Sequence, residues 1–235
     1  MKATWSDFHT RVDEVNSYLE FLEYVEIATS VRYTQESSQK YYQLNSDLKI
    51  VLRANAFLLL YNLVEATVIG GLTAIADEVN SSSTTYSQSS ERIQRVWLRG
   101  VLAKLREAGF DKICTEVEAV VEEAMKSNTL PAALSTHHLR QGALGNIDAR
   151  RVREIAKRVG FSASVRAKAN GGVELEKIKE NRNSLAHGVK TFHECGRDYT
   201  LRQLVKMRNE TVAYLEDILK NVEKYIRNRE FAAVP

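Results

Sequence analysis

Apolar residues recur at steps of three and four along most of this chain, which is the spacing of one face of an α-helix. Such stripes run through residues 5–29 and 200–229, and residues 48–78 are apolar over a wider face that suits a central helix. Two prolines and eleven glycines in 235 residues leave few points at which helices would break. The pattern predicts an all-α bundle of long helices.

Shorter helices are expected in the second half, and two of them carry end signals. The additional helices should span residues 91–107, 111–125, 149–159 and 173–187. Asn146-Ile147-Asp148 offers a cap for the start of the third, and Gly160 and Gly188 stand where left-handed residues end helices. Polar stretches, including residues 32–46, 80–90 and 162–172, are expected as connections, and no long strand pattern is present.

Length and composition predict one soluble domain. Hydrophobic residues make up 44% of the chain and charged residues 27%, as in globular proteins. We expect residues 1–235 to form a single domain in which residues 131–172 are a basic insertion with a helix. Two cysteines give no disulfide framework, the start has no signal-like apolar core, and Asn62 and Glu65 interrupt the most apolar stretch. A cytoplasmic location without a membrane is therefore expected.

Positive charge is concentrated in one segment. The segment from Pro131 to Asn170 contains eight Arg and Lys but two acidic residues, which gives it a net charge of +6. Because the whole chain has a net charge of +3, the rest of it sums to −3. Clustered Arg and Lys can follow an RNA backbone, although such runs are also common on solvated helix faces. The residues predicted to bind RNA are Arg150, Arg151, Arg153, Lys157 and Arg158.

The segment with the clearest chemistry is Arg182-Asn183-Ser184-Leu185-Ala186-His187, at the end of a predicted helix. RNA can be cut without metal when a base takes the proton of the 2′-hydroxyl and a cation stabilises the phosphate. Histidine suits proton transfer near neutral pH, and the planar fork of arginine suits phosphate oxygens. The residue types alone also fit a surface Arg followed by a helix-capping His.

The motif resembles that of the HEPN superfamily, in which an Arg is followed after four to six residues by a His. The polar residue after Arg, here Asn183, is also typical. The surroundings are similar to one branch of HEPN nucleases: residues 57–68 resemble its second helix, residues 145–161 its inserted basic helix, and residues 177–226 its C-terminal half. The likeness spans about residues 48–226.

This resemblance implies a HEPN-like helical bundle that usually dimerises with the two motifs at the interface. It implies a metal-independent endoribonuclease that leaves a 2′,3′-cyclic phosphate, and it implies roles in toxin–antitoxin systems or phage defence, sometimes with a restraining partner protein. Arg182 would hold the phosphate, His187 would transfer protons, and Asn183 would orient the phosphate or His187. No cofactor is implied.

Two other functions stay open. A chain with this fold can be a catalytically inactive HEPN-like module that binds RNA or protein, or a structural partner such as an antitoxin. One position departs from HEPN toxins whose antitoxin is a nucleotidyltransferase: the modified Tyr that follows two residues after the His is Val189 here. That form of control is not expected.

Asn62 and Glu65 are polar residues within the apolar central helix, three apart and therefore on one face. Burying either without a partner would cost roughly 2–7 kcal/mol. We expect one of them, and Glu65 in the catalytic set, to face the Arg182/His187 helix, although a solvent-edge position fits equally well.

A metal site is not predicted. His187, His193, Glu194 and Cys195 contain ligand types, but their spacing matches no familiar zinc pattern.

Overall fold

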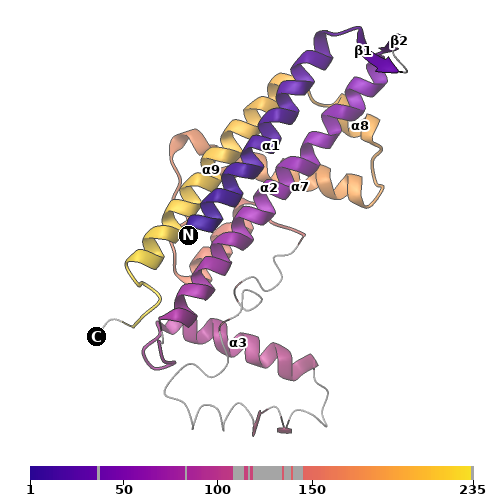
Figure 1. The fold of residues 1–235 in the computed structure, drawn as a ribbon. Coiled ribbons are helices and arrows are strands. Elements are labelled where there is room, and N and C mark those ends of the chain that lie inside the picture. The colour runs from indigo at the N-terminus through magenta and orange to yellow at the C-terminus, as the bar shows by residue number, and fades with distance from the viewer. Residues whose placement is uncertain are drawn as a thin grey trace. The chain divides into compact units, whose positions relative to one another are not determined.

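A computed structural model of the chain describes residues 1–35, 38–82, 84–107 and 145–233, together with residues 114, 115, 117, 118, 134 and 139. Figure 1 shows its elements. The helices are α1 (Lys2–Ile27), α2 (Ser46–Ser81), α3 (Glu91–Glu107), α6 (Ala149–Val159), α7 (Val173–Ala186), α8 (Phe192–Arg197) and α9 (Leu201–Arg227), with a 3-10 turn η1 (Ala167–Gly172). The all-α prediction is confirmed.

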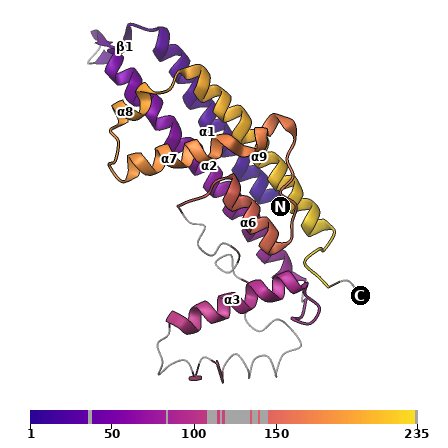
Figure 2. The ribbon, with the colours of Figure 1, turned by 180° about the vertical axis from the view of Figure 1, so that it is seen from behind.

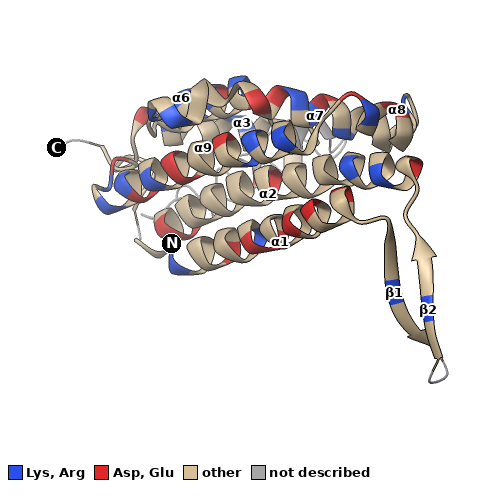
Figure 3. Cartoon of the chain, turned by 90° about the horizontal axis from the view of Figure 1, so that it is seen from above, with Lys and Arg blue, Asp and Glu red and all other residues tan. Residues whose placement is uncertain are grey.

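One predicted connection was wrong. Residues 32–46 overlap an antiparallel hairpin of β1 (Ser30–Gln35) and β2 (Ser38–Gln43), in which Val31 lies opposite Tyr42 and Tyr33 opposite Lys40. Val, Tyr and Thr favour strands, but β2 is exposed along its whole length, so no alternation of apolar and polar residues marks it. Figure 3 shows the hairpin extending beyond the ends of α1 and α2.

Two further connections contain short helices. The stretch after Gly188 includes α8, which begins with a capping box in which Thr191 and Glu194 bond to each other's backbone N–H groups. The stretch 162–172 includes η1. The helix expected over residues 111–125 lies largely outside the described residues.

The chain divides into two compact units. Residues 6–66 and 166–214 form one, here named the motif unit because it contains Arg182 and His187. Residues 1–5, 67–165 and 215–235 form the other, named the α3–α6 unit after two of its helices. Helices α1, α2 and α9 contribute residues to both. A single domain with a basic insertion at 131–172 stays a prediction.

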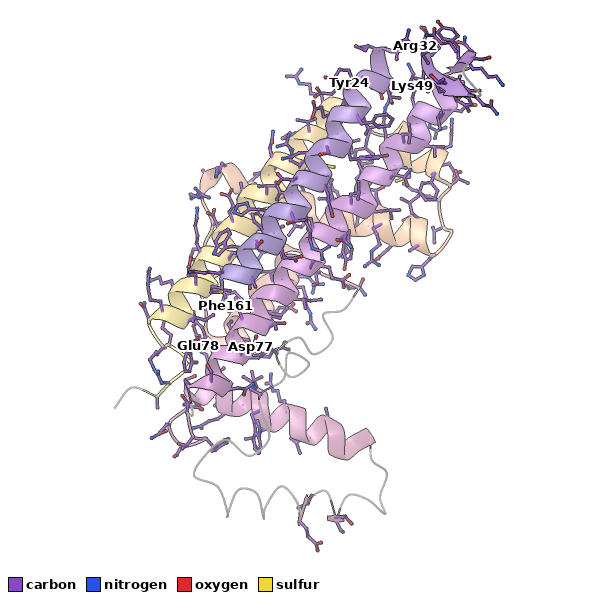
Figure 4. The ribbon with its side chains drawn as sticks, viewed as in Figure 1. Tyr24, Arg32, Lys49, Asp77, Glu78 and Phe161 are labelled. Carbon is purple, nitrogen blue, oxygen red and sulfur yellow. The ribbon has the colours of Figure 1, made fainter. Side chains whose placement is uncertain are left out.

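The core of the motif unit lies between α1 and α2, which run side by side (Figures 1 and 2). Their buried residues include Phe8, Leu22 and Phe57. Near the hairpin, Arg53 pairs with Glu26 through bonds of 2.5 and 2.7 Å, and Lys49 donates to the carbonyl oxygens of Glu26 and Ala28. Figure 4 shows Lys49 at this end of α2. These bonds fix the two helix ends that carry the hairpin.

In the α3–α6 unit, α6 has the ends that the sequence predicts. The Asp148 side chain accepts the Arg151 backbone N–H at 2.8 Å, and Gly160 ends the helix with a φ of 118°. The Tyr225 hydroxyl donates to the Val159 carbonyl at 3.1 Å, which attaches the end of α6 to α9. Burial is the main cause that raises the pKa of this Tyr225 phenol.

Helix α2 is long and apolar enough, by length and composition, to cross a membrane, and half of its most apolar window is buried inside the protein. The core helix of a soluble protein has the same length and composition. The cytoplasmic location stays a prediction.

Candidate active site

The predicted motif lies in the last turn of α7 and immediately after it. Arg182 and Asn183 are in the helix, and His187 is its C-cap residue. Gly188 follows with a left-handed φ of 66°, and its N–H bonds to the Leu185 carbonyl while that of Val189 bonds to the Ser184 carbonyl. The predicted glycine termination is confirmed, and it reverses the chain directly after His187.

Arg182 contacts two side chains of α2 and one of its own helix. Its Cζ lies 3.7 Å from the centre of the Tyr61 ring, and its Nη2 lies 3.8 Å from Glu65 Oε2. Nη1 donates to Asn183 Oδ1 at 2.8 Å. Tyr61 and Glu65 are four residues apart and therefore share one face of α2. The Arg182 side chain keeps 19% of its surface exposed.

His187 has a different environment. Its side chain is exposed. Five residues along a helix correspond to a rotation of about 140° and a rise of about 7.5 Å, so Arg182 and His187 project from different sides of α7. Arg182 contacts α2 of its own chain, whereas the His187 imidazole is open to solvent.

Asn181, directly before the motif, fixes α7 to the segment that follows it. Its buried amide nitrogen donates to the Lys177 carbonyl at 2.8 Å and to the Tyr199 hydroxyl at 2.9 Å. Its oxygen accepts from the Cys195 thiol at 3.2 Å. Asn181 was not among the residues predicted from the sequence. The available signal was its position between Ile178 and Leu185, at helical spacing on the buried face.

Of the two polar residues in α2, only Glu65 lies against Arg182. The Asn62 side chain is exposed and its Oδ1 accepts from Arg11 Nη1 of α1. Arg11 also pairs with Asp7 at 3.0 Å. Asn62 therefore contributes to the packing of α1 on α2.

The residues considered for a metal site have separate structural settings. Glu194 caps α8, His193 Nε2 lies 3.4 Å from Asp47 Oδ1, and burial raises the pKa of the Cys195 thiol. In the part of the chain that the structure describes, no group of three or more His, Cys, Asp or Glu is arranged to hold a metal ion.

The predicted RNA-binding residues lie on α6, in the α3–α6 unit. Arg150 and Arg151 both bond to Glu154, at 3.3 and 2.8 Å. Lys157 is exposed, and Arg158 is partly buried with its Nη2 donating to the Leu139 carbonyl. The remaining member of the set is Arg153, which is exposed.

Comparison with known families gives one result. The family described as HEPN_MAE_28990-like HEPN matches residues 2–231 of the chain. No curated protein and no solved structure shows a significant match. HEPN domains are generally associated with RNA cleavage, which indicates a nuclease or RNA-binding role. A match over almost the whole length means that the chain belongs to the HEPN_MAE_28990-like family of HEPN proteins.

Proposed function

We propose that the protein is a metal-independent endoribonuclease that cleaves RNA with Arg182 and His187. The observation that carries this proposal is the fixed guanidinium of Arg182, held by Tyr61, Glu65 and Asn183 in the helix that ends at an exposed His187. A preorganised cation and a group that transfers protons near neutral pH are the two parts that RNA cleavage needs.

The reaction needs no group from outside the protein and the RNA. The 2′-hydroxyl oxygen loses its proton to a base and forms a bond to the adjacent phosphorus, and the bond from phosphorus to the 5′-oxygen breaks. That oxygen takes a proton and leaves as a 5′-hydroxyl, while the other product ends in a 2′,3′-cyclic phosphate. His187 transfers a proton in this sequence, and Arg182 binds the phosphate oxygens as negative charge accumulates on them.

Asn183 and Glu65 act through Arg182. Asn183 fixes one edge of the guanidinium by its 2.8 Å bond, and Glu65 draws the opposite nitrogen toward α2. At 3.8 Å the Glu65 contact is an ion pair longer than a hydrogen bond. A phosphate can therefore displace it partly without breaking a short bond. We assign Glu65 as a positioning residue.

A homodimer would complete the site. The exposed His187 imidazole of one subunit is available to meet the Arg182 edge of the other, since the two side chains project from different sides of α7. We further propose that the enzyme acts as a toxin or a phage-defence effector in the cytoplasm, restrained by an antitoxin or another partner protein of its system.

The direct test uses purified protein, a structured RNA and excess chelator. We expect the wild type to cleave the RNA, and Arg182→Ala and His187→Ala each to lower the rate at least about a hundredfold. Equal cleavage by wild type and both variants would refute the assignment. Tight RNA binding without cleavage by the wild type would instead support the inactive HEPN-like binding module.

A further inference from the structure

Helices α3 and α6 enclose a hollow of about 340 Å³ in the α3–α6 unit. Among the residues that the structure describes, its lining is almost entirely cationic, with Arg92, Arg95, Arg99, Lys157, Arg158 and one carboxylate, Glu154. Three of the five cations come from α3, which contributed nothing to the basic segment identified from the sequence. The charge therefore gathers by folding, from two stretches about fifty residues apart.

The α3 arginines form one row. Arg92, Arg95 and Arg99 are three and four residues apart, which places them on one face of the helix, and all three are exposed. The other face of α3 is buried through Ile93 and Val96. Like charges at this spacing repel one another in the free protein, so a bound anion would stabilise the arrangement.

The single carboxylate does not neutralise the hollow. Glu154 accepts bonds from Arg150 and Arg151, which do not line the hollow, and the Arg151 bond is the main cause that lowers its pKa. Arg95 pairs with Glu91 at 2.5 Å, but both side chains are about 70% exposed, and exposed pairs of this kind contribute little. The lining keeps a net positive charge.

Arg158 is a partly buried member of this positively charged lining. Its Nε is buried and has no hydrogen-bond partner among the described residues. Burial first, and then repulsion from Arg151 and Arg99, lower the pKa of its guanidinium. Partly burying a charge is unfavourable unless an opposite charge compensates it, and among the described residues Glu154 is the carboxylate that attracts this guanidinium.

We propose that this α3–α6 hollow binds phosphate groups of the RNA backbone. Guanidinium groups bind phosphate oxygens through paired N–H donors, and a row of them suits a chain of phosphates better than it suits a neutral or cationic ligand. The choice of RNA as the source of the phosphates rests on the proposed function. The hollow, rather than the Glu154-paired Arg150 and Arg151, is then the RNA-binding part of α6.

The test is RNA binding measured in the full-length chain carrying His187→Ala, so that RNA stays intact. The hollow variant is Arg95→Gln/Arg99→Gln, and the matched control is Arg150→Gln/Arg153→Gln, which removes the same charge from exposed positions that do not line the hollow. Fluorescence anisotropy of a labelled single-stranded RNA gives Kd over a range of salt concentrations. Thermal unfolding checks that each variant is folded.

We expect the hollow variant to bind RNA about tenfold more weakly and to lose about one to two units of salt-dependence slope, because two phosphate contacts are removed. The control should change Kd less than about threefold. Arg95→Lys/Arg99→Lys should restore most of the affinity, since it keeps the charge. Equal losses in hollow and control variants, or none in the hollow variant, would overturn the proposal.

A competing source of phosphate is tested in the same protein. Excess mononucleotide should compete only weakly with RNA. The RNA assignment is wrong if mononucleotide raises the thermal midpoint of the protein only when Arg95 and Arg99 are present, while RNA affinity is the same with and without these two arginines. Failure of this site is distinguishable from failure of the proposed nuclease. Cleavage by the wild type tests the Arg182 site, whereas these binding measurements involve no cleavage.

Discussion

The Arg182 guanidinium contacts the ring of Tyr61, the carboxylate of Glu65 and the amide of Asn183, and these three contacts together orient it. The sequence pointed to Arg182 and to Glu65 as a candidate partner, because a charged residue within an apolar helix needs one. Tyr61 could not be recognised as the surface under the guanidinium. In the sequence it is one aromatic residue among the apolar side chains of a core helix, and packing alone explains it.

Replacing Tyr61 tests the stacking contact. Tyr61→Leu removes the ring 3.7 Å from Arg182 Cζ, whereas Tyr61→Phe keeps it. Cation–π contacts are worth about 0.5–2 kcal/mol, so Leu should lower kcat by roughly two- to thirtyfold relative to Phe. Steady-state RNA cleavage measures this. Equal rates for Phe and Leu would show that the ring does not position Arg182.

Replacing Glu65 by Gln tests its assignment as a positioning residue. Gln keeps the size of the side chain but loses the charge that attracts Arg182 Nη2. We expect kcat to fall about tenfold with a smaller change in KM, because small misplacements of a catalytic group mainly slow the reacting complex. Full activity together with full stability in Glu65→Gln would exclude this role.

Asn181 is predicted to matter for stability. Asn181→Ala removes the bonds to the Lys177 carbonyl and the Tyr199 hydroxyl inside the motif unit. The loss should be about 1–3 kcal/mol in the free energy of unfolding, as for other buried hydrogen-bonded groups. His187→Ala is the control, since an exposed side chain should change stability by less than about 0.5 kcal/mol. Denaturant unfolding compares them, and equal stability would contradict the role of Asn181.

At the scale of elements, α8 lies so close to α2 that one glycine is required. A Cβ on Gly196 would be 1.9 Å from the Ile50 carbonyl oxygen. Helix propensity alone predicts that Gly196→Ala stabilises by about 0.5–1 kcal/mol. The contact with backbone reverses the sign, and we expect destabilisation by at least about 1–3 kcal/mol.

A second helical glycine is the matched control for Gly196. A Cβ on Gly71, in α2, would meet Leu219 and Val222 only at ordinary contact distances of 3.6 Å and more. Gly71→Ala should therefore be neutral or stabilising. Thermal unfolding of both variants distinguishes the cases, and a stabilised Gly196→Ala would show that α8 does not pack as described.

The elements also show what a sequence pattern can reveal. Long helices with one buried face were predicted, and α6 was located with both of its ends, because periodicity and capping residues are local signals. The hairpin was not predicted, because strands exposed on both faces lack the alternation of apolar and polar residues that marks a half-buried strand. Helix α8 has six residues, too few to show a period, and only its capping box could have indicated it.

At the scale of the whole molecule, the sequence predicted the motif but not the hollow between α3 and α6. Arg182 and His187 are near each other in the chain, so spacing was informative. The hollow is lined by residues from 92–99 and from 154–158, which are far apart in the sequence. Tertiary packing brings them together, and spacing along the chain does not reveal it. The partner of Asn181 was hidden for the same reason, because Tyr199 is eighteen residues away.

Mixing two inactive variants tests the proposed dimeric site. If Arg182 of one subunit acts with His187 of the other, Arg182→Ala and His187→Ala subunits together form one intact site in each mixed dimer. Random pairing would then restore about a quarter of the wild-type activity, since half of the dimers are mixed and each has one of two sites. A mixture as inactive as its components would argue against a site shared between subunits.

The most direct test of the central claim is a map of RNA ends in cells that express the wild type, Arg182→Ala or His187→Ala. We predict new RNA ends carrying 2′,3′-cyclic phosphates in the wild type and their loss in both variants. New ends that persist in both variants would contradict RNA cleavage by Arg182 and His187. A wild type that is expressed and folded but produces no new ends would contradict it too.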